Sequence, residues 1–302
     1  MAQILVAGLI NIETTLKVDS FPIPYNPVHY PFFGINSTVS GVGYNVAKAL
    51  TTLGDEVNFL SLLGDDAASI LVRTDLKALG ISDKYIHSQL KNTPQSVILY
   101  DPNGQRAIFT DLKDIQDQAY PLAITEHVLN KSDLAVICNI NFSRPMLALA
   151  KEKKLPIATD VHAISQIDDA YNADYMASAT ILFQSHERLP MSPEAWAKLV
   201  YETYGTPIIV IGLGKDGALL AVHDDNFMER IPAVYTRPIV NTIGAGDALF
   251  SAFVHTYTHT KDAYTSIKTA TIFASYKIGS VGAAEGFLSQ GELHALVEQV
   301  YG

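Results

Sequence analysis

The feature that most constrains the fold of this chain is the alternation of short apolar runs with amphipathic segments. Residues 3–10, 134–140 and 207–214 are rich in Ile, Leu and Val and are bounded by polar residues or glycine, as buried strands are. Between such runs, residues 44–53 and 192–205 carry apolar side chains at helical spacing. This alternation predicts an α/β fold with a doubly wound, mostly parallel central sheet flanked by helices.

Two segments depart from this pattern. Residues 19–34 contain four prolines and several aromatics, so they cannot form a central strand or a helix interior. Residues 96–111 contain two β-prone runs around Asn103-Gly104, a strong hairpin signal. We therefore expect one domain over residues 1–302, with a small β lid formed by segments at about 14–36 and 92–111.

Charge and cysteine usage exclude several classes of partner. The formal net charge of -10 disfavours nonspecific binding to nucleic acid or to anionic membranes. Cys138 is the only cysteine, which excludes an intramolecular disulfide and a cysteine-based metal cage. The first residues form neither a membrane span nor the basic start of a signal peptide, so we expect a cytoplasmic protein.

One glycine-rich stretch matches a dinucleotide-binding pattern formally. Gly212, Gly214 and Gly217 fit G-x-G-x-x-G, but the residues that follow form another apolar run instead of the helix that this motif requires. We interpret the stretch as a tight turn between two strands, facing a nucleotide.

The stretch "NTIGAGDALFSAF" at residues 241–253 carries the strongest chemical signal. Gly244 and Gly246 allow the backbone to approach a ligand closely, and the N-terminus of a helix offers free N–H groups to an anion. Asp247 beside them is suited to accept a proton from an attacking hydroxyl. The residues alone leave a second reading open, in which Asp247 only caps the helix.

This stretch resembles the C-terminal signature of the ribokinase/PfkB family of carbohydrate and nucleoside kinases. Residues 37–54, "STVSGVGYNVAKALTTLG", resemble its N-terminal signature. The stretches "GLINIE", "FLSLLGDD", "DPNGQRAIF" and "VIGLGKDGALL" are similar to further family motifs in the same order. The resemblance covers nearly the whole chain and implies an ATP-dependent kinase with a ribokinase-like fold.

The resemblance also implies roles for single residues. Asp247 would be the general base, and the N–H groups of Gly244, Ala245 and Gly246 would stabilise the transferred phosphoryl group, with Mg²⁺ bridging the phosphates of ATP. On the acceptor side the matching residues are Asn11, Glu13, Gly41, Gly43, Asn45 and Arg106. On the nucleotide side they are Thr242, Gly212, Gly214 and Gly217.

Three positions depart from the family pattern. Glu13 replaces the usual sugar-binding aspartate, and its extra methylene moves the carboxylate by about 1.5 Å. Asn241 replaces the first aspartate of D-T-x-G-A-G-D, a region that often helps to bind a monovalent cation, so potassium activation is not assumed. The N-x-x-E motif, linked to phosphate and Mg²⁺, is expected near Glu187, where we find no match in register.

The acceptor is left open at this stage. The leading hypothesis is a kinase that phosphorylates a hydroxymethyl group of a sugar or sugar-like alcohol. A nucleoside kinase of adenosine, inosine or pseudouridine type is the first alternative, and a non-catalytic sugar- or nucleotide-binding regulator is the second. The aromatics of residues 19–34 either stack on a nucleobase or bury against the lid of a second copy in a homodimer.

Overall fold

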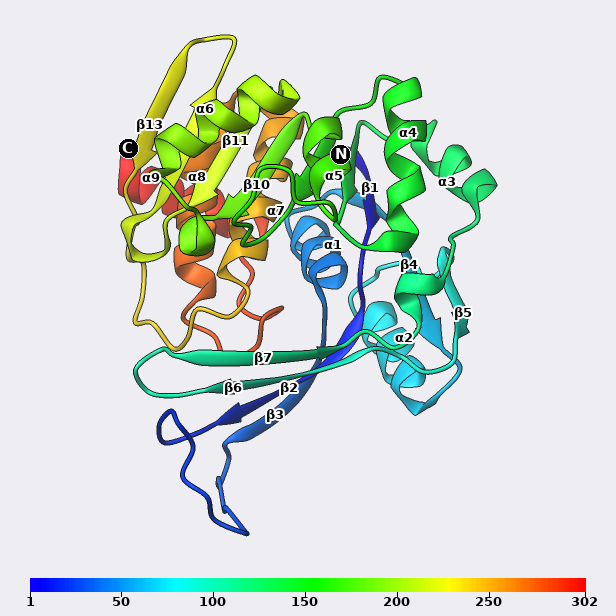
Figure 1. Cartoon of the computed structure of the whole chain (residues 1–302), viewed down its shortest axis with the longest axis vertical. Coiled ribbons are helices and arrows are strands. Elements are labelled where there is room, and N and C mark those ends of the chain that lie inside the picture. Colours follow the sequence, from blue (N-terminus) through cyan, green and yellow to red (C-terminus); the bar gives the residue numbers. More distant parts are fainter.

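A nine-stranded sheet forms the centre of the structure, a computed structural model that describes all of residues 1–302 (Figure 1). The strand order is β13-β12-β11-β10-β9-β8-β1-β4-β5. The strands are β1 (Gln3–Ala7), β4 (Glu56–Gly64), β5 (Ile86–Leu90), β8 (Leu134–Ile137), β9 (Ile157–Asp160), β10 (Ile181–Ser185), β11 (Ile208–Gly212), β12 (Ala218–Val222) and β13 (Phe227–Ile231). All neighbours pair in parallel except β11–β12 and β12–β13. The predicted doubly wound, mostly parallel sheet is confirmed.

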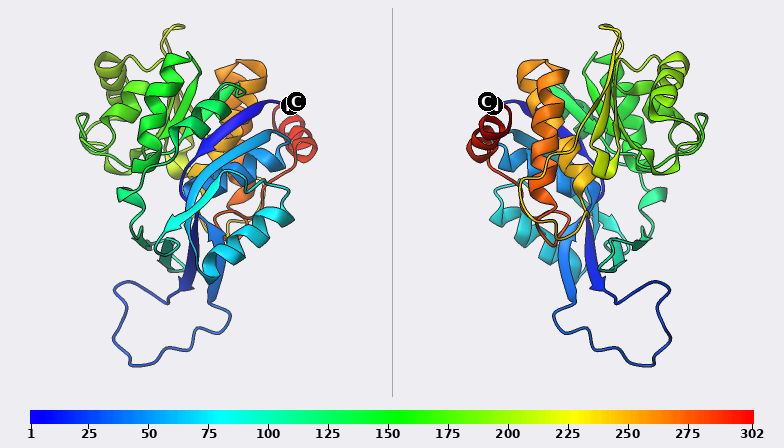
Figure 2. Two further views of the ribbon diagram at one scale, coloured as in Figure 1. Left: turned by 90° about the vertical axis from the view of Figure 1, so that its right-hand side faces the viewer. Right: turned by 90° about the vertical axis from the view of Figure 1, so that its left-hand side faces the viewer.

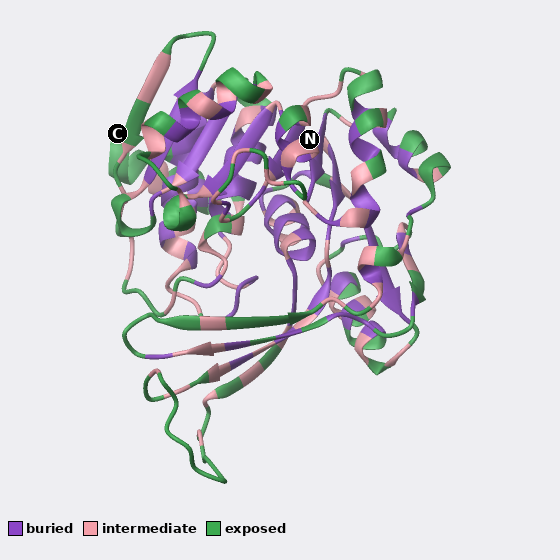
Figure 3. Cartoon of the chain, in the orientation of Figure 1, coloured by how far each residue is buried: buried purple, intermediate pink, exposed green.

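Helices cover both faces of this sheet, because its strands are apolar on both sides. Along β1, Ile4 and Val6 belong to one hydrophobic core, whereas Leu5 and Ala7 belong to the other. The first core is covered by α1 (Val42–Thr52), α2 (Ala67–Ala78), α7 (Ala245–Thr260), α8 (Ala263–Lys277) and α9 (Gln290–Tyr301). The second is covered by α3 (Leu122–Leu129), α4 (Arg144–Glu152), α5 (Ala173–Ser178) and α6 (Pro193–Tyr204). Figure 3 shows the central strands and the inner helix faces as buried.

A second, four-stranded sheet lies below the first in Figure 1, with the order β3-β2-β6-β7. Its strands are β2 (Asn11–Lys17), β3 (Ile35–Ser40), β6 (Gln95–Tyr100) and β7 (Arg106–Asp111). The predicted hairpin is β6–β7, whose turn is held by the Asp101 carboxylate accepting from the N–H groups of Asn103 and Gln105, both at 2.9 Å.

The proline-rich segment connects β2 to β3 as a long irregular loop that projects away from both sheets (Figure 2). Its aromatic side chains are exposed, with 94% of Tyr25 and 84% of Phe32 accessible. This loop forms no regular secondary structure, as its prolines predict.

The glycine-rich stretch at 212–217 joins β11 to the antiparallel strand β12, so it is a hairpin turn and not a dinucleotide-binding loop. Gly217 has a φ of 95°, and a Cβ there would lie 2.0 Å from the Ile231 carbonyl oxygen, so only glycine fits this turn. No helix combines the length and the apolar composition needed to cross a membrane.

Candidate active site

The candidate site lies beyond the carboxyl end of β1, where the strand order of the large sheet reverses between β8 and β4. Ligands of doubly wound sheets bind at such a switch point. The start of α1 packs directly on the backbone that follows β1, since a Cβ on Gly43 would lie 2.5 Å from the carbonyl carbon of Gly8. Gly41 has a φ of 104°, and a Cβ there would likewise lie too close to the Leu9 backbone. These two glycines bring α1 and its Asn45 close to β2.

Strand β2 turns a polar face toward the body of the protein. Asn11, Glu13 and Thr15 are buried, whereas the residues between them are partly exposed. A strand that buries its polar side chains in alternation reverses the usual pattern of a half-buried strand. This inversion is what a binding face requires, and it places Asn11 and Glu13 at the candidate site.

A chain of hydrogen bonds connects Glu13 with Asp247. The Ser40 hydroxyl lies 3.1 Å from Glu13 Oε2 and 3.3 Å from Asn45 Oδ1, and donates its single hydrogen to one of them. Asn45 Nδ2 donates to Asp247 Oδ2 at 2.6 Å. Four elements, β2, β3, α1 and α7, therefore hold the two carboxylates in one network.

Asp247 lies in the first turn of α7, and its side chain makes no capping hydrogen bond, because Gly244 is the N-cap residue. The capping alternative is thereby excluded for this structure. Burial raises the pKa of Asp247 to about 6, although the Asn45 hydrogen bond and the nearby His162 and Lys277 lower it. A carboxyl with this pKa is ionised at neutral pH and remains a usable base.

Two buried oxygens at the site have no hydrogen-bond donor within the protein. They are Asn11 Oδ1 and Glu13 Oε1. Asn11 Nδ2 donates to Ser96 Oγ at 3.0 Å, so only the Oδ1 of its side-chain amide remains without a partner. Burial also raises the pKa of Glu13, with the Ser40 hydroxyl acting against it. Each unpaired buried acceptor costs about 1–3 kcal/mol, so the pair is matched to a ligand that carries O–H donors.

The start of α7 offers N–H groups next to Asp247. Gly244 has a φ of 75°, and a Cβ there would lie 2.4 Å from the Ala283 carbonyl oxygen. The Ala245 N–H donates to the Thr242 carbonyl at 3.2 Å, whereas the N–H groups of Gly246 and Asp247 have no acceptor within the chain. A Cβ on Gly246 would meet no atom within 4 Å, so the backbone here faces open space. The free donors suit an anion.

The predicted nucleotide-side residues come together through Arg106, at the start of β7. Its guanidinium lies 3.5 Å from Thr242 Oγ1 and 3.7 Å from Glu187 Oε1. The sequence interpretation assigned Arg106 to the acceptor, but its contacts lie with the residues expected to face the nucleotide. The Gly212 carbonyl oxygen forms a hydrogen bond with His186 Nδ1 at 2.8 Å. The β11–β12 turn therefore lies beside His186, the residue that precedes Glu187.

Glu187 follows β10, and its carboxylate is exposed. Gln184 stands three residues earlier, which is the spacing of N-x-x-E with glutamine in place of asparagine. The sequence interpretation missed this register because it searched for an asparagine. Gln184 is buried, accepts from Trp196 Nε1 at 3.0 Å and leaves its own Nε2 without an acceptor.

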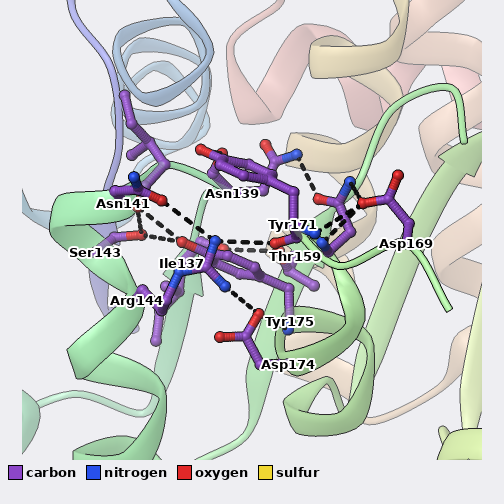
Figure 4. Close-up of polar contacts among 12 residues, drawn as sticks. Ile137, Asn139, Asn141, Ser143, Arg144, Thr159, Asp169, Tyr171, Asp174 and Tyr175 are labelled. Atoms are coloured by element: carbon purple, nitrogen blue, oxygen red, sulfur yellow. Dashed lines mark hydrogen bonds and ion pairs between the residues drawn. The ribbon is translucent and has the colours of Figure 1, made fainter. Parts of the chain in front are cut away.

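The rim of the site at the ends of β8 and β9 is fixed by a second polar network (Figure 4). Thr159 donates to the Ile137 carbonyl at 2.7 Å, and Asn139 donates to Asn172 at 3.0 Å. Tyr171 donates to the Asn139 carbonyl at 3.1 Å. These bonds hold the loops on either side of Asp160, a carboxylate close enough to raise the pKa of Asp247.

The sequence interpretation also missed Ser40, Ser96 and Lys277. A single serine on a strand carries no chemical signal of its own, so only the polar alternation of β2 indicates that the neighbouring serines belong to a site. Lys277 is the last residue of a long helix, and a lysine at a helix end is ordinarily exposed.

Comparisons with known proteins match nearly the whole chain. The family model described as pfkB family carbohydrate kinase matches residues 1–290. An ATP-dependent ribose-1-phosphate kinase from Halopiger xanaduensis is 24% identical over 287 residues, with 94% of each chain covered. An acarbose 7(IV)-phosphotransferase from Actinoplanes is 25% identical over 279 residues, with 91% of each chain covered. A microbiome-derived acarbose kinase superposes with a TM-score of 0.87 at 23% identity, covering 98% of this chain and 99% of its own.

Proposed function

Because the chain belongs to the pfkB family of carbohydrate kinases, an ATP-dependent sugar phosphotransferase class, we propose that Asp247 deprotonates a hydroxymethyl group of a polyhydroxylated acceptor so that it attacks the γ-phosphate of ATP. The oxygen of the acceptor forms the new bond to phosphorus, the bond to the ADP oxygen breaks, and Asp247 takes the proton. The network through Asn45 and Ser40 orients this carboxylate.

The observation that carries the proposal is the pair of unpaired buried oxygens of Asn11 and Glu13 next to the network of Asp247. Vicinal hydroxyl groups of a sugar supply the two missing donors. An acceptor without them leaves both oxygens unpaired, which is how such a site discriminates against deoxy analogues. The polar face of β2 therefore favours a sugar or sugar-like alcohol.

We further propose that the N–H groups of Gly244, Gly246 and Asp247 stabilise the phosphoryl group in transfer. Ala245, which the sequence interpretation included, is replaced by Asp247 because the Ala245 N–H already donates to the Thr242 carbonyl. They lie at the positive end of α7, and their geometry is preformed. Arg106 adds a positive charge from the lid, next to Thr242. The β11–β12 turn with Gly212, Gly214 and Gly217 is the proposed nucleotide side.

Mg²⁺ fits the residues present. Glu187 offers an exposed carboxylate at the carboxyl end of β10, and one carboxylate together with substrate phosphates is a common Mg²⁺ environment. When bound, the ion neutralises charge on the phosphates.

We propose that the four-stranded sheet is a lid and that its outer face and the 18–34 loop meet a second copy. Ile35, Phe109 and most of the loop aromatics are exposed. The loop itself projects away from both sheets (Figure 2). This arrangement favours the hypothesis that the aromatics contact a second copy in a homodimer. It disfavours the alternative that they stack on a nucleobase bound to the same chain.

The test is ADP release with a panel of sugars, sugar phosphates and nucleosides. The proposal predicts turnover with a polyhydroxylated sugar and a loss of acceptor affinity when the hydroxyls facing Asn11 and Glu13 are removed. Turnover confined to nucleosides would select the nucleoside-kinase alternative, and binding without turnover would select the regulator.

A further inference from the structure

Lys277 is unusual because it is the one lysine or arginine that the fold buries completely. It is the last residue of α8, and its side chain points inward instead of extending into solvent. Burying an ammonium group is strongly unfavourable unless anions or carbonyl oxygens compensate for the lost water. Its surroundings must therefore supply that compensation.

The compensation comes from the candidate active site. Lys277 Nζ donates to the carbonyl of Ile243, which lies two residues before Ala245, the first residue of α7. The carboxylates of Asp247 and Glu13 are close enough to favour the charged ammonium, as is that of Glu285. The same lysine in turn lowers the pKa of both Asp247 and Glu13.

Lys277 is a cation at neutral pH. Burial lowers its pKa to about 8, the three carboxylates act against this, and the guanidinium of Arg237 adds to it. The group thus contributes a positive charge near Asp247.

The segment at 241–244 is held against the end of α8 by several further contacts. The N–H groups of Val240 and Asn241 both donate to the Ile278 carbonyl, at 2.9 and 3.2 Å. Asn241 Nδ2 donates to the Val281 carbonyl at 2.7 Å, while its Oδ1 accepts from the Ile243 N–H at 3.0 Å. Asn241 needs both the donor and the acceptor of its amide for this, and a carboxylate cannot donate.

We propose that the Lys277 ammonium is a built-in cation of the active site, which orients the 241–244 segment and makes phosphoryl transfer independent of a bound monovalent cation. This inference rests on the proposed kinase function. Lys277 is a positioning residue: it acts on the start of α7 through the Ile243 carbonyl and on Asp247 through its charge.

Two features of the site support this assignment. The Ile243 carbonyl, an oxygen that could coordinate a metal cation, already accepts from the ammonium. Asn241 is neutral, so the segment lacks an acid of its own that would attract a free cation. Because Lys277 is part of α8, its positive charge is present at this place without the binding of a free ion.

The first test is the rate of ADP release by the wild-type protein, with its acceptor, in potassium salts and in sodium or tetramethylammonium salts of equal ionic strength. The proposal predicts rates within twofold of one another. A severalfold activation by K⁺ would overturn it. This measurement needs no variant to fold.

The second test uses Lys277→Met, which keeps most of the side-chain volume and removes the charge. We expect kcat to fall roughly 100-fold, as when one electrostatic contact to a transition state is lost, with a smaller change in KM. Lys277→Ala leaves space, so added K⁺ or NH₄⁺ should restore part of its kcat. If Lys277 acted only through packing, these ions would not restore the kcat of Lys277→Ala.

Lys268→Met is the matched control, because Lys268 lies exposed on the same helix; its kcat should not change. A folded Lys277→Met with wild-type kcat, or a folded Lys277→Ala that no cation restores, would contradict the inference. A wild-type protein without turnover on any acceptor would instead overturn the proposed function.

Discussion

At the residue scale, the proposed chemistry depends on the pKa of one carboxyl group, that of Asp247, and its surroundings set this pKa. Asp247 receives one hydrogen bond, from Asn45, and lies near the ammonium of Lys277 and the carboxylates of Glu13 and Asp160. Burial outweighs the groups that stabilise its anion, and the pKa rises to about 6. A carboxyl group with this pKa is ionised at neutral pH and is still basic enough for the role proposed for Asp247.

The pH dependence of kcat/KM follows from this value. Asp247 must be deprotonated to act, so kcat/KM should fall about tenfold per pH unit below pH 6 and level off above about pH 7. Asn45→Ala removes the donor that stabilises the anion, so the pKa rises and the acid limb should move up by about one pH unit. Steady-state rates measured across pH provide the check.

The control for that profile is Asn130→Ala, which removes an exposed amide at the end of α3. Its acid limb should coincide with that of the wild type. An Asn45→Ala profile that stays in place, or moves to lower pH, would show that this hydrogen bond does not set the basicity of the catalytic group.

At the element scale, the small sheet is joined to the large one by few polar contacts on the nucleotide side. Arg106 at the start of β7 contacts Thr242 and Glu187, and its side chain is about one third exposed. Partly exposed ion pairs of this kind contribute about 0–1 kcal/mol. The contact is therefore weak, as the proposed opening of the four-stranded sheet as a lid requires.

Arg106→Ala should weaken closure of the lid more than it changes the chemistry. We expect kcat/KM for the acceptor to fall by up to about fivefold, and the fraction of ATP lost to water to rise, because a looser lid excludes water less well. Comparing ADP release with phosphorylated acceptor gives both quantities. Arg188→Ala removes a neighbouring exposed charge that has no contact with the lid and should change neither.

A buried carboxylate ties α7 to the turn between α1 and β4. Asp55 is fully covered, and its two oxygens accept from His255 at 2.7 Å and from His259 at 2.8 Å, one turn apart on α7. Breaking such a buried set leaves polar groups without partners. This cluster fixes the far end of the helix that carries Asp247.

Asp55→Ala should lower the free energy of unfolding by about 3 kcal/mol, since both imidazoles lose their acceptor. Urea unfolding followed by circular dichroism measures it. Asp117→Ala, on an exposed turn, should stay within about 0.5 kcal/mol of the wild type. A similar loss in both variants would mean that the Asp55 cluster contributes nothing specific.

Several elements could be predicted from sequence because their signals are local. The apolar runs locate the parallel strands, Asn103-Gly104 locates the β6–β7 turn, and the glycines before Asp247 locate the start of α7. Strands β2 and β3 carry mostly polar residues, and their regularity comes from pairing with β6 and with each other. Residues that act through distant contacts, such as Lys277 and Ser40, have no local signal at all.

At the scale of the whole molecule, the four-stranded sheet and the 18–34 loop leave apolar side chains exposed. Tyr25, Phe32 and Phe33 are exposed on this loop, which projects away from both sheets (Figure 2), and Phe109 lies on the edge strand β7. Exposed apolar surface of this kind on a globular domain is typical of an interface.

We expect the protein to sediment as a dimer, and the double substitution Phe32→Ser with Phe33→Ser to shift it toward the monomer. Sedimentation velocity over a concentration series measures this. Leu71→Ser, an exposed apolar residue on α2, serves as the control. A wild-type protein that is monomeric at all concentrations, or a double variant that remains dimeric, would contradict an interface through this loop.

The central claim is that Asp247 is the base of a phosphoryl transfer to a sugar hydroxyl, and acceptor-dependent ADP release by Asp247→Asn tests it most directly. The amide retains the size of the side chain but cannot take the proton, so kcat should fall by about 10²–10⁴-fold. Asp224→Asn, an exposed aspartate on the β12–β13 turn, should match the wild type. Turnover by Asp247→Asn at the wild-type rate would contradict the account.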